Sequence, residues 1–417
     1  MAYFREIYPK LISEKDNNKI IILLGARQVG KTTILKELQK EIQKEATTFY
    51  LDLDFLANYE IISSTDNLIA YLKQNDFHKG ERYYLFLDEI QRFKDISMIL
   101  KNLYDHYPEI KIYATGSSSL DIKKNLKDSL AGRKIIFHIH PLSFYEFLIF
   151  KNQGDLAKLL LTEKNILIET YLPYLYEFLV FGGYPEVALT NDNARKVSLL
   201  ESIFDLYFKK DIIELMQIDD IDRIKNCLRI VAADQGQLIN YSHIAREIGS
   251  SVRDVKKYLE IFKDTFILFQ LNPFFSNKHK EIIKTPKYYF WDNGIRNYFL
   301  KNFQDINSRA DAGFLFESFV IGGINKRKNV LQNLKFWRSK LGQEIDLVIE
   351  DQNNISPYEI KFKTSQNRKD YSGLVAFMDK YKIDKGFLIS LANLQEKNID
   401  GKKIIYQHPF NLTNNFY

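Results

Sequence analysis

Cysteine, long apolar runs and an excess of charge of one sign are all scarce in this sequence of 417 residues. Cys227 is the only cysteine, which excludes an intramolecular disulfide and a cysteine-rich zinc site and fits a reducing compartment. No stretch approaches about 18 uninterrupted apolar residues, so no membrane-spanning helix is expected. Residues 1–19 mix basic and acidic side chains and lack the apolar core of a secretory signal. We therefore expect a cytoplasmic protein without a membrane partner.

The balance of charge is close to even. Lysine and arginine number 59 against 53 aspartate and glutamate residues, a net charge of +6, which excludes a polycation but is compatible with a local basic face. Hydrophobic residues make up 45% of the chain and charged residues 27%, which is typical of folded domains. At about 150 residues per domain, the length predicts two to four domains.

Four regions with different patterns follow one another along the chain. Short apolar runs alternate with helical patterns over residues 1–153, which predicts a parallel α/β sheet with strands at 19–24, 48–53, 83–87, 111–114 and 134–140. Residues 154–235 repeat apolar side chains at helical spacing and predict a helical subdomain. Residues 236–300 follow the order of a winged helix-turn-helix. Residues 301–417 return to an α/β pattern.

The most specific motif lies between the first apolar run and the first helix. It reads Gly25-Ala26-Arg27-Gln28-Val29-Gly30-Lys31-Thr32, followed by Thr33 at the start of the helix, which is a P-loop in its required context. The glycines let backbone N–H groups face the phosphates, and the amino end of the helix adds positive charge. We expect Lys31 to contact the β- and γ-phosphates of ATP and the Thr32 hydroxyl to bind Mg²⁺.

A second motif completes the predicted nucleotide site. The apolar run at 83–87 ends in Asp88 and Glu89, about 55 residues after the P-loop, which is the position of a Walker B motif. We expect Asp88 to help hold Mg²⁺. We expect Glu89 to orient and deprotonate the attacking water, because hydrolysis needs a carboxylate near the γ-phosphate.

Two further polar positions accompany these motifs. The run at 111–114 ends in Thr115-Gly116-Ser117-Ser118, and we choose Ser117 as a polar sensor between the Walker B acid and the γ-phosphate; the same hydroxyl can cap the helix that follows. Arg133 directly precedes the run at 134–140. It is either an arginine finger or sensor, which often reaches the nucleotide of a neighbouring subunit, or one half of a surface salt bridge. A homo-oligomer formed through Arg133 is therefore one expected partner.

The order of these motifs resembles that of AAA+ type P-loop ATPases fused to a DUF4143 region. Four short motifs extend the resemblance over nearly the whole chain: Leu130-Ala131-Gly132-Arg133, Pro141-Leu142-Ser143-Phe144-Tyr145-Glu146-Phe147, Phe181-Gly182-Gly183-Tyr184-Pro185-Glu186 and the stretch from Lys284-Thr285-Pro286-Lys287 to Trp291-Asp292-Asn293-Gly294. The resemblance implies an ATPase core over residues 1–153, a helical lid over 154–235, a winged helix over 236–300 and a restriction-endonuclease-like domain over 301–417. No sensor-2 arginine can be assigned, because basic residues are common throughout the lid.

The last region resembles a PD-(D/E)xK nuclease core. Glu317 lies on an expected helix, Trp337-Arg338 begins a hairpin, Asp346 lies in its second strand, and Glu359 and Lys361 lie in the next strand. Strand alternation puts Glu359 and Lys361 on one face. Asp346 and Glu359 can then share Mg²⁺ or Mn²⁺ while Lys361 polarises the attacking water. Glu317 can steady the waters of that metal ion. The alternative is an inactive nuclease-like fold that binds DNA or protein partners.

The expected recognition helix of the winged helix, residues 250–263, carries Arg253, Lys256 and Lys257. These side chains either neutralise DNA phosphates or belong to a face that packs against protein or solvent. Two classes of function stay open at this point. One is an ATP-driven enzyme that handles DNA and has a metal-dependent nuclease domain. The other is an ATP-switched signalling or scaffold protein whose nuclease-like domain is a docking surface.

Overall fold

A computed structural model describes residues 5–75, 77, 81–117, 130–162, 166–208, 212, 220–275, 285–352, 354–365 and 367–410. Two compact units divide the chain. The first comprises residues 1–140, 202–219 and 264–266, and the second comprises 141–201, 220–263 and 267–417. Within these described ranges, no helix combines the length and the apolar content that crossing a membrane requires. The domain limits at 153, 235 and 300 stay predictions.

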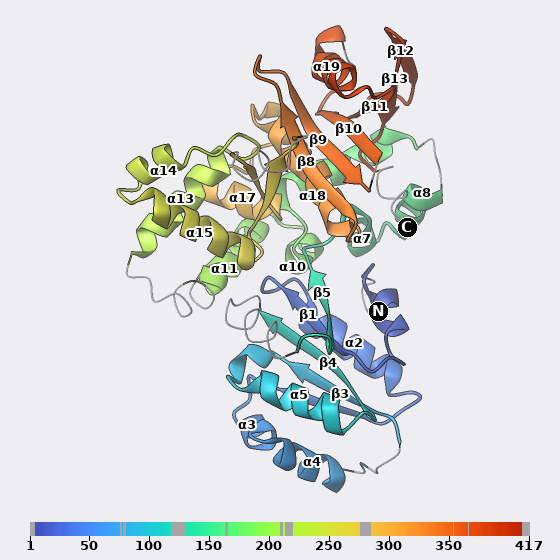
Figure 1. The fold of residues 1–417 in the computed structure, drawn as a ribbon, viewed down its shortest axis with the longest axis vertical. Helices are drawn as coiled ribbons and strands as arrows, with labels where there is room; N and C mark the ends of the chain where they lie inside the picture. The colour runs from blue at the N-terminus through green and yellow to red at the C-terminus, as the bar shows by residue number, and fades with distance from the viewer. Residues whose placement is uncertain are drawn as a thin grey trace. The chain divides into compact units, whose positions relative to one another are not determined.

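A five-stranded parallel sheet forms the centre of the first unit, in the order β2-β3-β4-β1-β5 (Figure 1). Every residue of β1, β3 and β4 is buried, as expected for strands covered on both faces. The predicted parallel α/β sheet is confirmed, but β4 continues through Ser117 instead of ending at residue 114. The strands are β1 (Ile20–Gly25), β2 (Thr48–Asp52), β3 (Tyr83–Asp88), β4 (Ile110–Ser117) and β5 (Lys134–Ile139).

Helices cover this sheet on both faces. The step from β1 to β2 runs along the sheet in the opposite direction to the step from β3 to β4, so right-handed crossovers place the intervening helices α2 and α5 on opposite faces. The connections that leave the neighbouring strands β1 and β4 therefore run in opposite directions, and the carboxyl ends of such a strand pair are where open α/β sheets bind ligands. The helices are α1 (Tyr8–Ser13), α2 (Lys31–Ile42), α3 (Ala57–Ile62), α4 (Thr65–Gln74), the 3-10 turn η1 (Ile90–Arg92) and α5 (Ile96–His106).

The second unit begins with the helical region that the apolar spacing predicts. The residues Gly182-Gly183-Tyr184 separate two of its helices as a loop. The helices are α7 (Phe144–Phe150), α8 (Gly154–Thr162), η2 (Ile168–Thr170), α9 (Leu172–Phe181), α10 (Pro185–Leu189), α11 (Asn193–Tyr207) and α13 (Ile221–Ala233). The last residues of α11 belong to the first unit.

The predicted order of a winged helix follows. Two helices, α14 (Tyr241–Glu247) and α15 (Val252–Asp264), precede an antiparallel hairpin of β6 (Leu268–Pro273) and β7 (Lys287–Phe290). β6 also pairs in parallel with β8 (Gln332–Arg338), so this hairpin forms one edge of the sheet that the C-terminal strands build.

That C-terminal sheet has eight strands in the order β12-β13-β11-β10-β9-β8-β6-β7 and mixes parallel with antiparallel pairs, which is compatible with a nuclease-like domain (Figure 1). Trp337 and Arg338 end β8 instead of beginning the hairpin, because the turn comes after them. The remaining strands are β9 (Glu344–Asp351), β10 (Asn354–Lys361), β11 (Lys385–Ser390), β12 (Glu396–Ile399) and β13 (Lys402–Gln407). The helices are α17 (Asn293–Leu300), η4 (Ile306–Ser308), α18 (Ala312–Arg327), η5 (Arg368–Tyr371) and α19 (Ser372–Tyr381).

Two of the short sequence motifs meet inside this unit. The Gly183 N–H donates to Asp292 Oδ2 at 2.7 Å, although the two residues are 109 positions apart. A Cβ on Gly182 would lie 2.1 Å from Asp292 Oδ1, and a Cβ on Gly294 would lie 2.1 Å from the carbonyl oxygen of Phe181. The glycines are therefore needed for the close approach of two backbone segments, which explains why these motifs occur together.

Candidate functional site

The P-loop wraps the carboxyl end of β1 and leads into α2. Gln28 and Gly30 have positive φ values of 59° and 95°, which turns the backbone into the concave form in which successive N–H groups bind anions. A Cβ on Gly25 would lie 2.1 Å from the carbonyl oxygen of Ile139, so only glycine fits there. The predicted nucleotide segment thus has the backbone shape that phosphate binding requires, with Thr33 exposed in the first turn of α2.

Lys31 and Thr32 both turn toward the interior of this loop. The Lys31 ammonium group is buried and donates to the carbonyl oxygens of Gly25 and Ala26 at 3.0 and 2.8 Å. The Thr32 hydroxyl donates to Asp88 Oδ1 at 3.2 Å. The fold therefore brings the predicted P-loop threonine and the predicted Walker B aspartate into contact.

Asp88 is a point of convergence for three hydroxyl groups. Besides Thr32, Tyr50 on β2 donates to Asp88 Oδ2 at 2.7 Å, and Thr115 on β4 donates to Asp88 Oδ1. Burial raises the pKa of Tyr50, and the hydrogen bond to Asp88 raises it further, so Tyr50 stays a neutral donor. Tyr50 and Thr115 are absent from the predicted site, although both lie on strands that pair with β3.

Glu89 follows Asp88 in a strained backbone conformation. Its φ of 55° is rare for a residue with a side chain, and such strain concentrates at functional positions. Its N–H donates to the Thr115 hydroxyl at 3.1 Å, and its carboxylate accepts a hydrogen bond from Gln91. The position of the Glu89 carboxylate is therefore held by neighbours on β4 and η1.

Ser117, the predicted sensor, is linked to this group through its backbone. Its N–H donates to Gln91 Oε1 at 2.9 Å, while its buried hydroxyl has no hydrogen-bond partner among the described residues. Thr115, two residues earlier on the same strand, is the residue that contacts Asp88. The sensor role of Ser117 stays a prediction. Its alternative role as a cap for the following helix falls on residues 118–129, which lie outside the described residues.

Arg133 directly precedes the first residue of β5, whereas the P-loop follows the last residue of the parallel strand β1, so the two lie at opposite ends of the strands. The next residue, Lys134, pairs with Ile20 at the first position of β1, whereas the P-loop follows the last position. The guanidinium group of Arg133 donates to the two carboxylate oxygens of Asp105 at 2.8 and 3.1 Å. Arg133 therefore does not reach the P-loop of its own subunit, and its role toward a neighbouring subunit stays a prediction.

A buried arginine near the amino end also supports the P-loop. Arg5 donates to the carbonyl oxygen of Val29 at 2.7 Å and to that of His140 at 2.8 Å. The hydrogen bond to Val29 holds the backbone of the P-loop in place. No local sequence pattern identifies this contact, because Arg5 lies 24 residues before Val29.

The predicted nuclease-like residues come together in the second unit. Lys361 on β10 lies 2.5 Å from Glu359 Oε1 and 3.4 Å from Asp346 Oδ2 on β9. Asp346 Oδ2 also accepts the N–H of Ile360 at 2.8 Å. Burial lowers the pKa of Lys361, but Asp346 and Glu359 outweigh burial and raise it, so the ammonium group stays charged.

Asp346 and Glu359 are the two carboxylates of this group that could hold a divalent cation together with its waters. Among the described residues, no three acidic, histidine or cysteine side chains form a ready metal site. Glu359 Oε2, however, is buried and has no hydrogen-bond partner among those residues, and burial together with Asp346 raises the pKa of Glu359 well above its ordinary value. Such an oxygen is costly unless a proton or cation compensates it, and Mg²⁺ commonly binds through one or two carboxylates.

Two residues of β7 join the acidic cluster, and neither is among the predicted site residues. The Lys287 ammonium group contacts Glu344 Oε1 and lies 3.7 Å from Glu317 Oε1. The Tyr289 hydroxyl donates to the same oxygen of Glu317 at 2.5 Å. Burial raises the pKa of Glu317 to about 7, while Lys287 acts in the opposite direction. The Glu317 carboxylate thus has two partners on β7, Lys287 and Tyr289.

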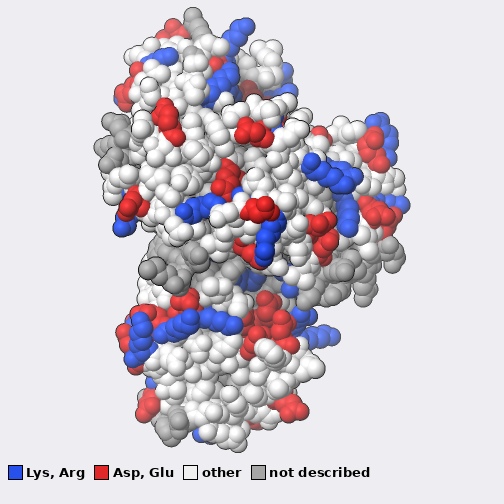
Figure 2. Space-filling model, turned by 180° about the vertical axis from the view of Figure 1, so that it is seen from behind, with Lys and Arg blue, Asp and Glu red and all other residues white. Residues whose placement is uncertain are grey.

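The three basic residues of the predicted recognition helix are all exposed on α15. Lys256 lies over the ring of Tyr241 on α14, with its ammonium group 5.2 Å from the ring centre, while Arg253 and Lys257 extend from the same helix. Positive and negative side chains of the described residues are interspersed over the face of the molecule in Figure 2. Contact of α15 with DNA stays a prediction.

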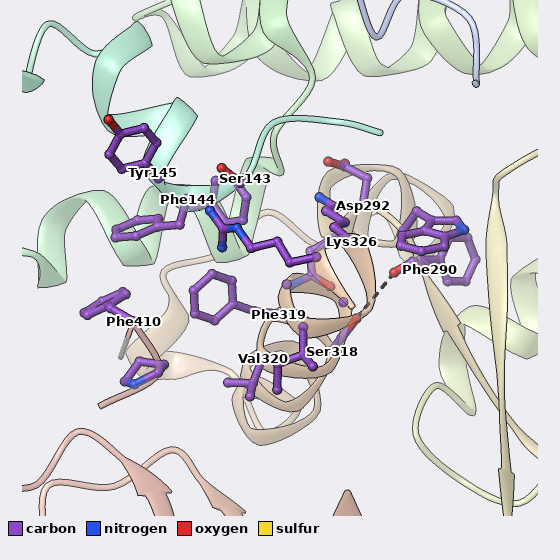
Figure 3. A pocket seen from close by; sticks show the side chains of 18 of the residues that line it. Ser143, Phe144, Tyr145, Phe290, Asp292, Ser318, Phe319, Val320, Lys326 and Phe410 are labelled. Carbon is purple, nitrogen blue, oxygen red and sulfur yellow. Dashed lines mark hydrogen bonds between the residues drawn. The ribbon is translucent and has the colours of Figure 1, made fainter. Parts of the chain in front are cut away.

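A small cavity in the second unit is lined by aromatic side chains (Figure 3). Phe144 on α7 stacks on Phe410 with ring centres 4.8 Å apart and meets Phe319 on α18 edge-on at 5.8 Å. Lys326, which also lines the cavity, donates to the carbonyl oxygens of Pro141 and Leu142. A space of about 50 Å³ is too small for a nucleotide, and none of the predicted site residues lines it.

Comparison with known families gives three matching segments. An AAA domain matches residues 17–148, a domain of unknown function, DUF8612, matches 172–305, and a second domain of unknown function, DUF4143, matches 312–409. The first match contains the P-loop, the Walker B acids and Thr115. The last contains Asp346, Glu359, Lys361 and Glu317.

The chain is also similar to individual relatives and to solved structures. An uncharacterized protein of Methanocaldococcus jannaschii is 30% identical over 354 residues, which cover 84% of this chain and 75% of the relative. An uncharacterized protein of Haemophilus influenzae is 26% identical over 414 residues and 96% of both chains. A Walker-type ATPase of Pyrococcus abyssi is 16% identical with a TM-score of 0.47, over 72% of this chain and 96% of that one. The chain belongs to the family of AAA-type P-loop ATPases that carry a DUF4143 region.

Proposed function

We propose that this protein binds ATP with Mg²⁺ and hydrolyses it. The observation that carries the proposal is the hydrogen bond of 3.2 Å between Thr32 and Asp88, which puts the two expected Mg²⁺ ligands at one point beside the P-loop. Mg²⁺ bound there would neutralise charge on the phosphates during transfer. Lys31 has to leave the carbonyl oxygens of Gly25 and Ala26 to reach those phosphates, so nucleotide binding is expected to move this side chain.

Glu89 is the proposed general base for the attacking water. Its backbone is fixed by Thr115 and its carboxylate by Gln91, so the carboxylate can hold a water in one place. Abstracting the proton of that water makes the oxygen a better nucleophile toward the γ-phosphate. Gln91 is also bonded to the Ser117 N–H, so movement at the end of β4 would reach Glu89 through a single side chain.

We further propose that the second unit acts on DNA. Asp346 and Glu359 would hold one divalent cation through carboxylate oxygens, and Lys361, which contacts both, would polarise the attacking water. The exposed Arg253, Lys256 and Lys257 would neutralise phosphates, so binding should weaken as salt rises. In this proposal Arg133 acts across a subunit interface on the nucleotide of a neighbouring copy.

A second candidate function is an ATP-switched scaffold with an inactive nuclease-like domain. The observation that favours it is the presence of two lysines, Lys287 and Lys361, which already compensate carboxylates of the acidic cluster. In that case the second unit would bind partners without cutting DNA.

One assay separates the two candidates. ATP hydrolysis and DNA cleavage are measured for the wild-type chain, with and without DNA and in Mg²⁺ or Mn²⁺, beside Lys361→Ala. Cleavage that the wild type shows and Lys361→Ala lacks, with ATP hydrolysis unchanged, supports the nuclease. ATP hydrolysis without cleavage under any of these conditions supports the scaffold.

A further inference from the structure

The acidic cluster consists of two pairs of carboxylates with different surroundings. We call Asp346 and Glu359 the outer pair, because they face the partly exposed Lys361, and Glu317 and Glu344 the inner pair, because they face the buried Lys287; the side chain of Glu344 is itself 29% exposed. The outer pair faces Lys361, whose side chain is 28% exposed, and leaves Glu359 Oε2 without a partner among the described residues. The inner pair faces Lys287, whose side chain is only 3% exposed. A cation could therefore displace the lysine at the outer pair more easily than the lysine at the inner pair.

Lys287 is held among the inner carboxylates by its backbone and its side-chain stem. The backbone of Lys287 on β7 pairs with Leu271 on β6 and forms an isolated β-bridge with Leu238. Its ammonium group lies 5.1 Å from the centre of the Phe336 ring, a contact that favours the charged form. Tyr289, two positions further on the same strand and fully buried, donates to the carboxylate oxygen of Glu317 that faces Lys287.

From this arrangement we infer that Lys287 serves as a built-in cation for the inner pair, so that the cluster accepts one divalent cation, at the outer pair, and not a second. A second cation would have to share Glu317 or Glu344 with the Lys287 ammonium group. Two positive charges at such short range repel strongly beside the buried Glu317, and the Lys287 side chain, which is 3% exposed, has little room to move away. The inference uses the proposed metal site for the outer pair only.

The inference changes the expected role of Glu317. Sequence comparison makes Glu317 a residue that steadies the waters of the metal ion, whereas here it is a partner of Lys287 and Tyr289. Lys287 is then a positioning residue, which fixes the number of cations and connects the β6–β7 hairpin to the cluster. Any chemistry at the cluster would use one metal ion together with Lys361.

Binding of Mn²⁺ to the full chain without nucleotide tests the inference, with the EPR signal of free Mn²⁺ as the readout. For the wild type we expect one Mn²⁺ that Asp346→Asn removes and Glu317→Gln leaves in place. For Lys287→Met we expect one further Mn²⁺, which the additional change Glu317→Gln removes. Lys335→Met is the matched control, because Lys335 is also buried, also lies near an aromatic ring and also pairs with a glutamate, Glu350. It should gain no Mn²⁺.

Other results of the Mn²⁺ titration either overturn the inference or separate it from the proposed metal site. Two Asp346- or Glu317-dependent ions in the wild type, or no gain in folded Lys287→Met, overturn the inference. No Asp346-dependent ion in the wild type, with a gain in Lys287→Met, rejects the proposed metal site at the outer pair and supports the role of Lys287 as the cation of the inner pair. If Lys287→Met is unfolded by circular dichroism, Mn²⁺ should restore its folding by replacing the missing charge, and failure to do so overturns the inference.

Discussion

Thr115 is the residue that ties the two Walker B acids together. Its buried hydroxyl donates to Asp88 and accepts the N–H of Glu89 at 3.1 Å. Threonine and valine have nearly the same shape, so replacing Thr115 by valine removes these bonds with little change in volume. The hydroxyl acts on the reaction only through the two acids, which makes Thr115 a positioning residue.

We expect Thr115→Val to lower kcat for ATP hydrolysis by about 10- to 100-fold, the range seen when a group that orients metal ligands is lost. ATP binding through the P-loop should be kept, so the affinity for ATP should change little. Thr115→Ser keeps the hydroxyl and is the control that should retain most of the activity. An equal loss in both variants, or no loss in Thr115→Val, would contradict this role. Steady-state kinetics together with nucleotide titration distinguishes these results.

Lys111 at the start of β4 makes stability depend on pH. Its ammonium group is buried against Asn17 Oδ1 and the carbonyl oxygen of Lys19, at 2.8 and 2.6 Å. Burial, with a further contribution from Arg82, lowers the pKa of Lys111 from 10.5 to about 7. Between these values the unfolded chain binds the proton more tightly than the folded chain, so the free energy of unfolding rises with pH.

The comparison of wild type with Lys111→Met isolates this effect. As pH rises from about 7 toward 10.5, we expect the wild type to gain stability relative to the variant, which has no charge to lose at this position. Urea denaturation at several pH values measures the difference in unfolding free energy. A difference that stays constant across this range would show that Lys111 keeps its ordinary pKa.

At the scale of elements, the packing of α9 against α17 depends on glycines. Gly294 in the first turn of α17 approaches the carbonyl oxygen of Phe181 at the end of α9, where a Cβ would lie 2.1 Å from that oxygen. Gly323 in α18 has the opposite surroundings, with nothing within 4 Å of its Cβ position. The two helical glycines therefore form a matched pair for substitution by alanine.

We expect Gly294→Ala to destabilise the protein by about 1–3 kcal/mol, because the backbones have to separate. Gly323→Ala should stabilise it by about 0.5–1 kcal/mol, since alanine loses less backbone freedom than glycine in a helix. Thermal denaturation of both variants measures the two shifts. If Gly294→Ala melted at or above the wild-type temperature, the close approach of α9 and α17 would be wrong.

The strands and the P-loop are the parts of the fold that local sequence predicts well. β1 and β3 are continuous apolar runs that are buried on both faces, and Gly30, Lys31 and Thr32 follow β1 directly, so short-range patterns contain the signal. Contacts between distant residues are different. Only Asn272 and Pro273 on β6 pair with β8, and no periodicity in either strand indicates that pairing.

In the candidate sites too, some contacts between residues distant in the sequence could not be predicted. Thr115 and Ser117 are both hydroxyl residues in one strand, and only the register of β4 beside β3 decides that Thr115 meets Asp88. Lys287 lies on β7, 30 positions before Glu317, and the short motif that contains it indicates no partner for its side chain. Predicting these partners requires the topology of the sheets, which sequence patterns specify less directly than the strands themselves.

At the scale of the whole molecule, Arg133 leads to a prediction about assembly. It lies at the end of the strands away from its own P-loop and is paired with Asp105. If it acts on a neighbouring subunit, turnover per subunit should rise with protein concentration from nanomolar to micromolar. Arg133→Ala should lose this rise while still binding ATP. A rate per subunit that stays flat, with a monomer in sedimentation, would remove the proposal.

Phosphate release by wild type, Glu89→Gln and Lys31→Ala measures whether the chain hydrolyses ATP with Glu89 as the base. We expect the wild type to hydrolyse ATP in a Mg²⁺-dependent way and Lys31→Ala to lose tight nucleotide binding. Glu89→Gln should bind ATP as the wild type does and turn it over at least about 100-fold more slowly, as the loss of a general base predicts. Hydrolysis by Glu89→Gln at the wild-type rate would contradict the account.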